Sequence, residues 1–255
     1  MTINLISILT IPQLKDNYSF IIKEKDNNKA IIIDPAESHS IIKCIKKNGL
    51  HIKAILLTHH HNDHTAGVKD ILNYTSVNVY SPNKEIYGTT KIVNDGDLIN
   101  LDFMKLKVIA TPGHTNDHVV FYDSDSKILF SGDSLFRLGC GRVFEGTNKQ
   151  MFSSINKIND LDNDTMVYCG HEYTLSNLRF LQSIFPLHPE FKSLKKKINL
   201  QIFNTSTSIP FNLGEEKALN PFLSNKSPHY RKFKKDNNFT DIQMFTYLRD
   251  LKNNF

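Results

Sequence analysis

Short apolar runs separated by polar turns dominate the first two thirds of the chain. Runs of about four to eight residues bounded by Asn, Asp, Gly, Ser or Pro are typical of strands. We expect strands at the following positions: 3–11, 18–23, 30–33, 52–57, 77–80, 91–93, 98–101, 104–110, 118–122, 127–131 and 165–169. Turn signals predict three hairpins, which join 18–23 to 30–33, 91–93 to 98–101, and 118–122 to 127–131.

Helical spacing of apolar residues appears between these strands and continues to the end of the chain. Ile41, Ile42 and Ile45 form the apolar face of a helix that begins near Ser38 or Ser40 and stops at Gly49. Further helices are expected over these ranges: 66–74, 148–158, 174–184 and 190–203. Residues 240–243, Thr-Asp-Ile-Gln, are a capping-box signal for a last helix. Between 203 and 240 the pattern predicts a loop through two prolines, and no strand is expected there.

The strands come in two batches, and each batch is closed by helices. This order favours an α/β fold with two sheets face to face and helices outside, although other α/β layouts fit the same pattern. From about residue 175 the pattern is purely helical. We therefore expect an α/β domain at 1–174 and a helical appendage at 175–255.

The loop between strand 52–57 and the helix that follows carries an unusual density of metal-binding side chains. It contains these residues: His59, His60, His61, Asp63 and His64. In extended chain, alternate residues point the same way, so His59 and His61 can face one ion. Asp63 and His64 follow as the chain turns into the helix and can face a second ion. Imidazole and carboxylate together suit zinc or a similar first-row metal.

Three more candidate ligands follow apolar strands, and each lies beside a glycine. His114 follows 104–110, Asp133 follows 127–131 and His171 follows 165–169. Ligands at the ends of four strands indicate a sheet scaffold that gathers its loops around a pair of metal ions. Asp117 and His60 lie nearby in sequence, but their roles are open.

Composition and charge narrow the class of protein. The chain has 255 residues, of which 40% are hydrophobic, so a sizeable core needs no disulfides. The net charge of +5 is concentrated at 195–197 and 231–235, which we interpret as solvated helix faces or as attraction for an anionic substrate. The three cysteines, Cys44, Cys140 and Cys169, form no Cys-x-x-Cys pair. This usage and the lack of a leader-like N-terminus or a membrane span predict a cytoplasmic protein.

The motifs in order resemble the metallo-β-lactamase superfamily. They are His-x-His-x-Asp-His at 59–64, Pro-Gly-His-Thr at 112–115, Ser-Gly-Asp at 131–133 and Gly-His at 170–171. More narrowly, Gly-Cys-Gly-Arg-Val-Phe-Glu-Gly at 139–146, Cys-Gly-His-Glu-Tyr-Thr at 169–174 and Asn-Pro-Phe-Leu at 220–223 are similar to glyoxalase II, the hydroxyacylglutathione hydrolase family. The resemblance spans nearly the whole chain. It implies a four-layered αββα sandwich with a C-terminal helical appendage.

The resemblance also implies a dinuclear metal site. His59, His61 and His114 would hold one ion, Asp63, His64 and His171 the second, and Asp133 would bridge the two. Zinc is the first choice, while iron and manganese accept the same donors. A metal-bridging hydroxide would attack the substrate carbonyl, and Asp63 would orient it as a catalytic residue.

The activity implied is hydrolysis of S-D-lactoylglutathione to D-lactate and glutathione, the second step of methylglyoxal removal. The enzyme is expected to act as a monomer, without nucleic acid or membrane as a partner. The resemblance carries substrate contacts to these residues: Arg142, Phe144, Tyr173, Arg249 and Lys252. Two positions depart from the family pattern. Phe144 stands where some members have Tyr, and Ser224 stands where Arg is usual. Both affect glutathione binding rather than the metal pair.

Other functions remain open at this stage. A glutathione persulfide dioxygenase of the same fold would use a single iron, and the helical appendage with Arg249 and Lys252 argues against it. A β-lactamase is disfavoured by the absence of a secretion signal. A nucleic-acid-processing relative would show salt-sensitive binding, but the basic runs lack interleaved aromatic residues apart from Phe233.

Overall fold

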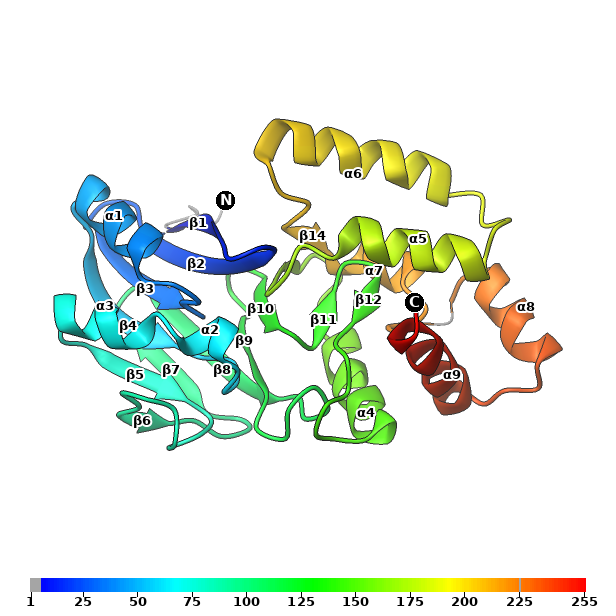
Figure 1. Ribbon diagram of the computed structural model, residues 1–255, viewed down its shortest axis with the longest axis horizontal. Helices are drawn as coiled ribbons and strands as arrows, with labels where there is room; N and C mark the ends of the chain where they lie inside the picture. Colours follow the sequence, from blue (N-terminus) through cyan, green and yellow to red (C-terminus); the bar gives the residue numbers. More distant parts are fainter. Residues whose placement is uncertain (1–5, 225) are drawn as a thin grey trace. The chain divides into compact units, whose positions relative to one another are not determined.

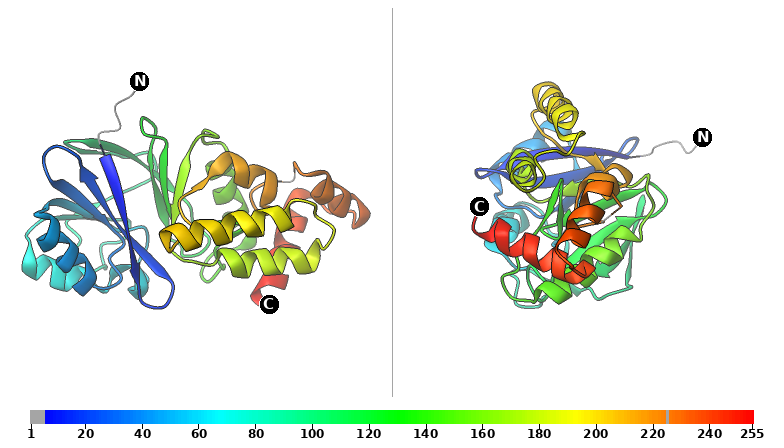
Figure 2. Two further views of the ribbon diagram at one scale, coloured as in Figure 1. Left: turned by 90° about the horizontal axis from the view of Figure 1, so that it is seen from above. Right: turned by 90° about the vertical axis from the view of Figure 1, so that its right-hand side faces the viewer.

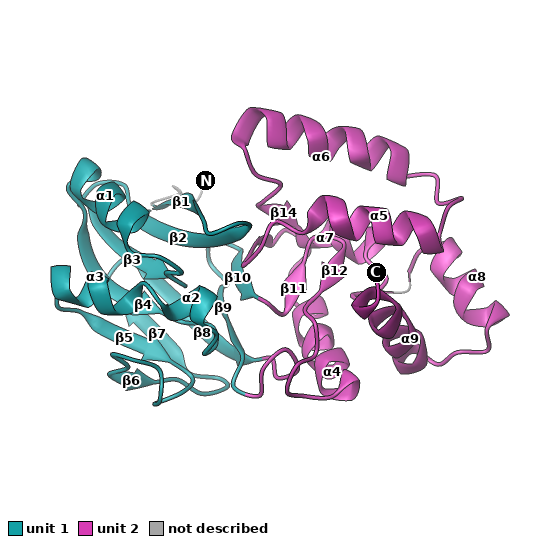
Figure 3. Ribbon diagram, viewed as in Figure 1, with its two compact units in different colours: residues 1–110, 117–132 teal, residues 111–116, 133–255 magenta. Residues whose placement is uncertain are grey.

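The computed structural model describes residues 6–224 and 226–255 (Figure 1). The first part of the predicted strand 3–11, residues 3–5, lies outside the described residues. The chain forms two compact units (Figure 3). Unit 1 comprises Met1–Ala110 and Asp117–Gly132, and unit 2 comprises Thr111–Asn116 and Asp133–Phe255.

The first sheet of unit 1 has strand order β1-β2-β3-β4-β5-β6. Its strands are β1 (Ile6–Gln13), β2 (Asn17–Glu24), β3 (Lys29–Ile33), β4 (His51–Leu56), β5 (Asn78–Ser81) and β6 (Lys91–Ile92). The first three strands are antiparallel, and β3 to β6 run parallel to one another. Parallel strands end at the same edge, so the loops after β3 and β4 are neighbours.

A second set of strands in unit 1 forms an antiparallel meander in the order β10-β9-β8-β7. The strands are β7 (Leu98–Leu101), β8 (Met104–Ala110), β9 (Val119–Asp123) and β10 (Ile128–Gly132). All residues of β9 and β10 are buried. Phe20 of β2 meets Phe130 of β10 with ring centroids 5.5 Å apart, which places apolar side chains of both sheets in one core.

Helices cover the other face of the first sheet. They are α1 (His39–Asn48), α2 (Asn62–Thr65) and α3 (Val68–Tyr74). Ile41 and Ile45 of α1 and Ile71 of α3 pack with Ile32 and Ile55 of the sheet in one buried cluster. Gly49 ends α1 in the left-handed region at φ 59°, a conformation that glycine adopts without steric cost.

Unit 2 is mainly helical. Its helices are α4 (Asn148–Asn159), α5 (Thr174–Ile184), α6 (Phe191–Thr205), α7 (Leu213–Leu219), α8 (Pro228–Asp236) and α9 (Asp241–Asn253). Two short antiparallel strand pairs join them: β11 (Leu135–Phe136) with β12 (Gly139–Cys140), and β13 (Met166–Cys169) with β14 (Phe211–Asn212). Helices α5 and α6 lie side by side (Figure 2).

Most predicted elements are confirmed within a few residues, including the hairpins β2–β3 and β9–β10. The capping box of the last helix is also confirmed, since the Thr240 hydroxyl accepts from the Gln243 amide and the Gln243 side chain accepts from Thr240. The exposed lysines at 195–197 lie on the solvent face of α6, as expected. Where the structure describes helices, none is long and apolar enough to cross a membrane.

The predicted hairpin between 91–93 and 98–101 is wrong. Strand β6 pairs in parallel with β5, and the Val93 amide continues this pairing to the Ser81 carbonyl. The next turn instead belongs with β8, because the Gly96 amide donates to the Val108 carbonyl and the Val108 amide donates to Asp97. Residues 94–97 therefore do form a turn, but this turn carries the chain from β6 of the first sheet to β7 of the second.

The expectation of a loop between 203 and 240 is also wrong. This segment contains β14, α7 and α8. Helix α7 is short and is capped by Asn212, whose side chain accepts from the Glu215 amide, while α8 starts with Pro228. The hairpin β11–β12 was likewise read as loop. Two-residue strands have too few residues to show a period, and helices of seven and nine residues show only a weak one, so tertiary contacts decide them.

Candidate metal centre

In unit 1 the predicted metal loop follows β4 and enters α2 earlier than expected. Helix α2 begins at Asn62, with His61 as its N-cap, so Asp63 and His64 lie on the first turn. His59 and His64 are buried, whereas Asp63 is partly exposed. The loop therefore presents donors from an extended segment and from a helical turn on the same short stretch.

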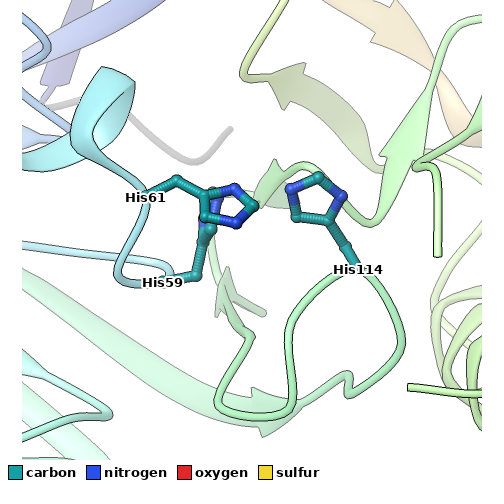
Figure 4. Close-up of side chains that lie close together, drawn as sticks. All are labelled: His59, His61 and His114. Carbon is teal, nitrogen blue, oxygen red and sulfur yellow. The ribbon is translucent and has the colours of Figure 1, made fainter. Parts of the chain in front are cut away.

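Three imidazoles of this loop come together. The rings of His59 and His61, both drawn in Figure 4, have centroids 4.7 Å apart in an edge-to-face arrangement. The ring centroids of His59 and His64 are 4.3 Å apart. One donor atom each from His59 and His61 lie within 4.8 Å of one another. The same holds for His59 with His64 and for Asp63 with His64. This spacing allows neighbouring side chains to share an ion.

Asp34 holds this loop from behind. It lies at the end of β3 with 2% exposure, and its carboxylate accepts from the Thr58 amide at 2.8 Å and from the Thr58 hydroxyl at 2.7 Å. The Asp34 Oδ2 also lies 3.1 Å from Nδ1 of His64. The sequence interpretation missed this residue. The sequence shows only that an aspartate directly follows the apolar run 30–33, whereas the parallel pairing of β3 with β4 that brings Asp34 to the metal loop comes from the structure.

These hydrogen bonds set the tautomers of two histidines. A carboxylate can only accept, so Nδ1 of His64 donates to Asp34 and its Nε2 carries a lone pair. The Thr58 hydroxyl donates to Asp34 and therefore accepts from Nδ1 of His59, 3.0 Å away, which leaves the lone pair of His59 on Nε2. Asn17 orients Asp63, another predicted ligand of the loop, because its side-chain amide donates to Oδ2 of Asp63 at 3.0 Å.

His60 and Asp117, whose roles were open, form a pair beside these donors, since the ring centroids of His60 and His61 are 5.1 Å apart. Nδ1 of His60 lies 3.0 Å from both oxygens of Asp117, and the Asn83 side chain donates to the same carboxylate at 3.1 Å. His118, which the sequence interpretation did not single out, stacks on His59 with centroids 4.8 Å apart. Gly132 makes room here, since a Cβ atom would lie 2.6 Å from the Thr58 hydroxyl oxygen.

In unit 2 the other three predicted ligands meet at one carboxylate. Nε2 of His114 lies 3.4 Å and Nε2 of His171 lies 3.3 Å from Oδ2 of Asp133. All three side chains are buried. Nδ1 of His114 lies 2.9 Å from the Arg142 carbonyl, which can only accept, so this histidine also keeps its lone pair on Nε2 (His114 is drawn in Figure 4).

The residues of both units fit a divalent metal. The predicted ligands are five imidazoles and two carboxylates, the nitrogen and oxygen donors that zinc and other first-row metals prefer. Metal-binding histidines in proteins usually donate the other ring N–H to a carboxylate, a carbonyl or a similar acceptor. His59, His64 and His114 each do so. Both the kinds of donor atom and the tautomers of these three histidines thus fit a divalent metal.

The predicted substrate contacts differ widely in exposure. Phe144 is 59% exposed, its ring lies 5.3 Å from that of His114, and the Arg142 guanidinium lies 5.4 Å above it. Tyr173 stacks on His171 with centroids 4.7 Å apart and rings nearly parallel. Arg142, Phe144 and Tyr173 therefore border the unit 2 ligands, as a substrate contact requires.

Arg249 and Lys252 do not share an exposed face of α9. Arg249 is 5% exposed, and its Nη1 donates to the Cys140 carbonyl at 2.7 Å. Lys252 is partly buried, and its ammonium lies 3.4 Å from the Ser176 hydroxyl and over the Phe255 ring. Burial and the nearby guanidinium of Arg249 lower the pKa of Lys252 to about 8. The predicted substrate contact of each residue stays a prediction.

Two motif residues whose roles the sequence did not reveal have structural partners in unit 2. The Asn220 side chain donates to the Gly139 carbonyl at 3.1 Å and accepts from the Phe222 amide at 3.0 Å. Glu172 accepts from the Ser208 amide at 2.7 Å and from its hydroxyl at 2.6 Å. Cys169 is buried and forms no disulfide, and burial raises the pKa of its thiol.

Comparison with known proteins covers the whole chain. Residues 14–171 match the metallo-beta-lactamase superfamily model, and residues 172–255 match the model of the hydroxyacylglutathione hydrolase C-terminus. A hydroxyacylglutathione hydrolase of Pectobacterium atrosepticum is 42% identical over 253 residues, which are 98% of this chain and 100% of the relative. One from Wigglesworthia glossinidia brevipalpis is 42% identical over 254 residues, which are 98% of this chain and 99% of the relative.

Solved structures agree on the fold. A metallo-beta-lactamase from Staphylococcus aureus superimposes with a TM-score of 0.66 at 25% identity, covering 98% of this chain and 72% of that one. ETHE1 from Myxococcus xanthus has a TM-score of 0.66 at 21% identity, covering 94% and 95%. The fold is therefore the α/β sandwich of this superfamily with a C-terminal helical region. The chain belongs to the hydroxyacylglutathione hydrolase family of the metallo-β-lactamase superfamily.

Proposed function

We propose that this chain hydrolyses S-D-lactoylglutathione to D-lactate and glutathione with two divalent metal ions held by the predicted ligands. The relatives named hydroxyacylglutathione hydrolase align over nearly their full length, which supports a thioester hydrolase of this substrate class. The observation that carries the proposal is the set of buried imidazoles whose Nδ1 groups are engaged and whose lone pairs are on Nε2.

The proposed assignment follows the family pattern. His59, His61 and His114 would hold one ion, Asp63, His64 and His171 would hold the other, and Asp133 would be a ligand of both. Chain continuity supports this grouping, because two of the unit 2 ligands closely follow strands of unit 1. His114 comes four residues after Ala110 of β8, and Asp133 directly follows Gly132 of β10. We propose zinc for both positions, while iron and manganese would accept the same donors.

The proposed mechanism needs few protein groups beyond the ligands. Two divalent ions would supply a hydroxide nucleophile near neutral pH and would polarise the thioester carbonyl. Asp63, whose Oδ2 accepts from the Asn17 side chain, would orient the attacking water and accept its proton. The leaving group is a thiolate, which departs without prior protonation. This chemistry suits a thioester better than an amide.

Substrate binding is proposed for the cationic and aromatic side chains of unit 2. Arg142 and Lys252 offer positive charge to the carboxylates of glutathione, and Tyr173 offers a hydroxyl beside the ligand His171. Phe144 gives the same segment an exposed apolar ring but no hydroxyl. The family match over 172–255 favours this hydrolase over the persulfide dioxygenase.

The remaining properties are also proposals. Free Cys44, Cys140 and Cys169 fit a reducing compartment, so we propose that the enzyme works in the cytoplasm. We keep a monomer as the proposed assembly. The helical region from residue 175 onward is proposed as the substrate-binding part, with the boundary predicted at 174/175.

The test is hydrolysis of S-D-lactoylglutathione by the purified protein, followed by loss of thioester absorbance, with metal content measured on the same sample. His61→Ala should reduce kcat by about a hundredfold or more and lower the metal content, because it removes a ligand. His39→Ala is the matched control, since His39 is an exposed histidine of the same unit. No turnover by a folded protein with two bound metals would reject this substrate.

A further inference from the structure

Arg249 of α9 is committed to the backbone of one short segment. Its Nη1 donates to the Cys140 carbonyl at 2.7 Å and lies 3.4 Å from the Gly141 carbonyl. The guanidinium also stacks over the Phe222 ring, 5.6 Å from its centroid. With 5% exposure, the side chain is enclosed by these partners. A buried cation held by carbonyl oxygens orients the peptide groups that carry them.

The segment that Arg249 holds is packed directly on the ligand Asp133. Cys140 ends β12, whose partner strand β11 starts two residues after Asp133. The Gly141 amide donates to the Ser134 carbonyl at 3.1 Å. A Cβ atom at Gly141 would lie 1.9 Å from the Asp133 carbonyl oxygen, so only glycine fits. The position of residues 140 and 141 therefore constrains the backbone of the ligand itself.

The next residue of the segment contacts a second ligand. The Arg142 carbonyl accepts from Nδ1 of His114 at 2.9 Å, which keeps the lone pair of His114 on Nε2. Nε2 in turn lies 3.4 Å from Asp133. A continuous set of contacts thus runs from α9 through Cys140, Gly141 and Arg142 to His114.

We propose that Arg249 is a positioning residue for the metal ligands His114 and Asp133. It holds residues 140 and 141 so that the Arg142 carbonyl sets the orientation and tautomer of His114. This inference rests on the proposed metal assignment of these two residues. It gives the C-terminal helix a function in the metal centre, separate from any contact with the substrate.

The chemistry of the contact favours arginine. A guanidinium is planar, so it can lie over the Phe222 ring while its Nη1 faces the Cys140 and Gly141 carbonyls. A lysine at 249 would keep the charge but not the planar group that lies over Phe222. Arg249→Lys should therefore retain part of the function, and Arg249→Met should lose it while keeping the apolar stem.

The experiment compares wild type, Arg249→Lys and Arg249→Met on two substrates. One is S-D-lactoylglutathione, and the other is the same thioester of γ-glutamylcysteine, which lacks the glycine carboxylate. Zinc affinity is measured by competition with a chelator, and amide hydrogen exchange at Gly141 is measured on the protein as purified. Lys232→Met is the control, because Lys232 is an exposed cation of helix α8 in the same unit.

A positioning role predicts that Arg249→Met lowers zinc affinity and kcat by about tenfold, by the same factor for both substrates. Amide hydrogen exchange at Gly141 should be faster in Arg249→Met than in wild type. Arg249→Lys should give intermediate values of zinc affinity, kcat and exchange rate. The inference is overturned if Arg249→Met raises only KM, only for the substrate with the glycine carboxylate, at unchanged zinc affinity. If wild type does not hydrolyse either thioester, the proposed function fails, while zinc affinity and Gly141 exchange still decide the role of Arg249.

Discussion

Three histidines of the candidate centre are held at Nδ1 by three different acceptors. His59 donates to the Thr58 hydroxyl, His64 to the Asp34 carboxylate and His114 to the Arg142 carbonyl. The result is the same in each case, because the acceptor fixes the ring orientation and leaves the lone pair on Nε2. Asp34 is the most connected of these acceptors, since it also receives both the amide and the hydroxyl of Thr58.

Asp34→Asn tests this support at a single residue. The Asn side chain has the same size, but its amide nitrogen cannot accept, so at least one of the three donors around Asp34 loses its partner. We expect zinc affinity to fall by about 10- to 100-fold with the fold retained, measured by chelator competition. Asp102→Asn is the control, because Asp102 is exposed and pairs only with Lys29 among the described ion pairs. Unchanged zinc affinity in Asp34→Asn would contradict the role assigned to this carboxylate.

At the scale of elements, the hairpin β11–β12 depends on side chains from the helical region. Its strands have two residues each, too few to be stable alone. Glu216 of α7 accepts from the Leu138 amide at 2.7 Å, Asn177 of α5 donates to the Arg137 carbonyl at 3.0 Å, and Asn220 donates to Gly139. The helices after residue 174 therefore shape the hairpin that leads from Asp133 to Arg142.

Glu216 makes this support dependent on pH. Burial raises the pKa of its carboxyl from 4.5 to about 7, so folding favours the protonated form. A raised carboxyl pKa contributes stability that is present below pH 4.5 and is lost as the pH rises through about 7. Glu216→Gln keeps an acceptor for Leu138 and has no proton to lose.

We expect the free energy of unfolding of wild type to fall by about 3 kcal/mol relative to Glu216→Gln between pH 4.5 and 8. Urea unfolding of both proteins at a fixed zinc concentration and several pH values measures this difference. Glu215→Gln is the matched control, because Glu215 is exposed on the same helix and pairs with Lys197. Parallel pH profiles for wild type and Glu216→Gln would show that Glu216 titrates normally.

At the scale of the whole molecule, the predicted ligands extend from His59 to His171 and belong to both compact units. A metal that binds these residues binds only the folded chain, so its binding free energy adds to stability. The hydrolase activity and the folding stability should therefore depend on the same ions.

Removal of metal tests this link. Dialysis against a chelator should abolish thioester hydrolysis and lower the unfolding midpoint by on the order of 10 °C, since a ligand at a thousand times its Kd contributes about 4 kcal/mol. Zinc should restore both. His61→Ala should show a smaller shift than wild type, as measured by differential scanning calorimetry with and without zinc. Equal midpoints for the metal-free and zinc-loaded wild type would contradict a shared dependence.

The sequence by itself determined the local features of this protein. The strands before the ligands, the helices at 148–158, 174–184 and 190–203 and the last capping box could all be predicted, because apolar period and capping signals are local. The order of the ligand motifs also identified the family, since these chemical groups are themselves the signal.

Only the tertiary structure decided which distant groups are partners. It paired β6 with β5 rather than with β7, created the two-residue strands β11, β12 and β14, and placed Asp34 behind His64. It also turned Arg249 inward onto Cys140. Each of these contacts joins residues far apart in the chain or elements too short to show a period, so their energy comes from packing and hydrogen bonding that no local pattern records.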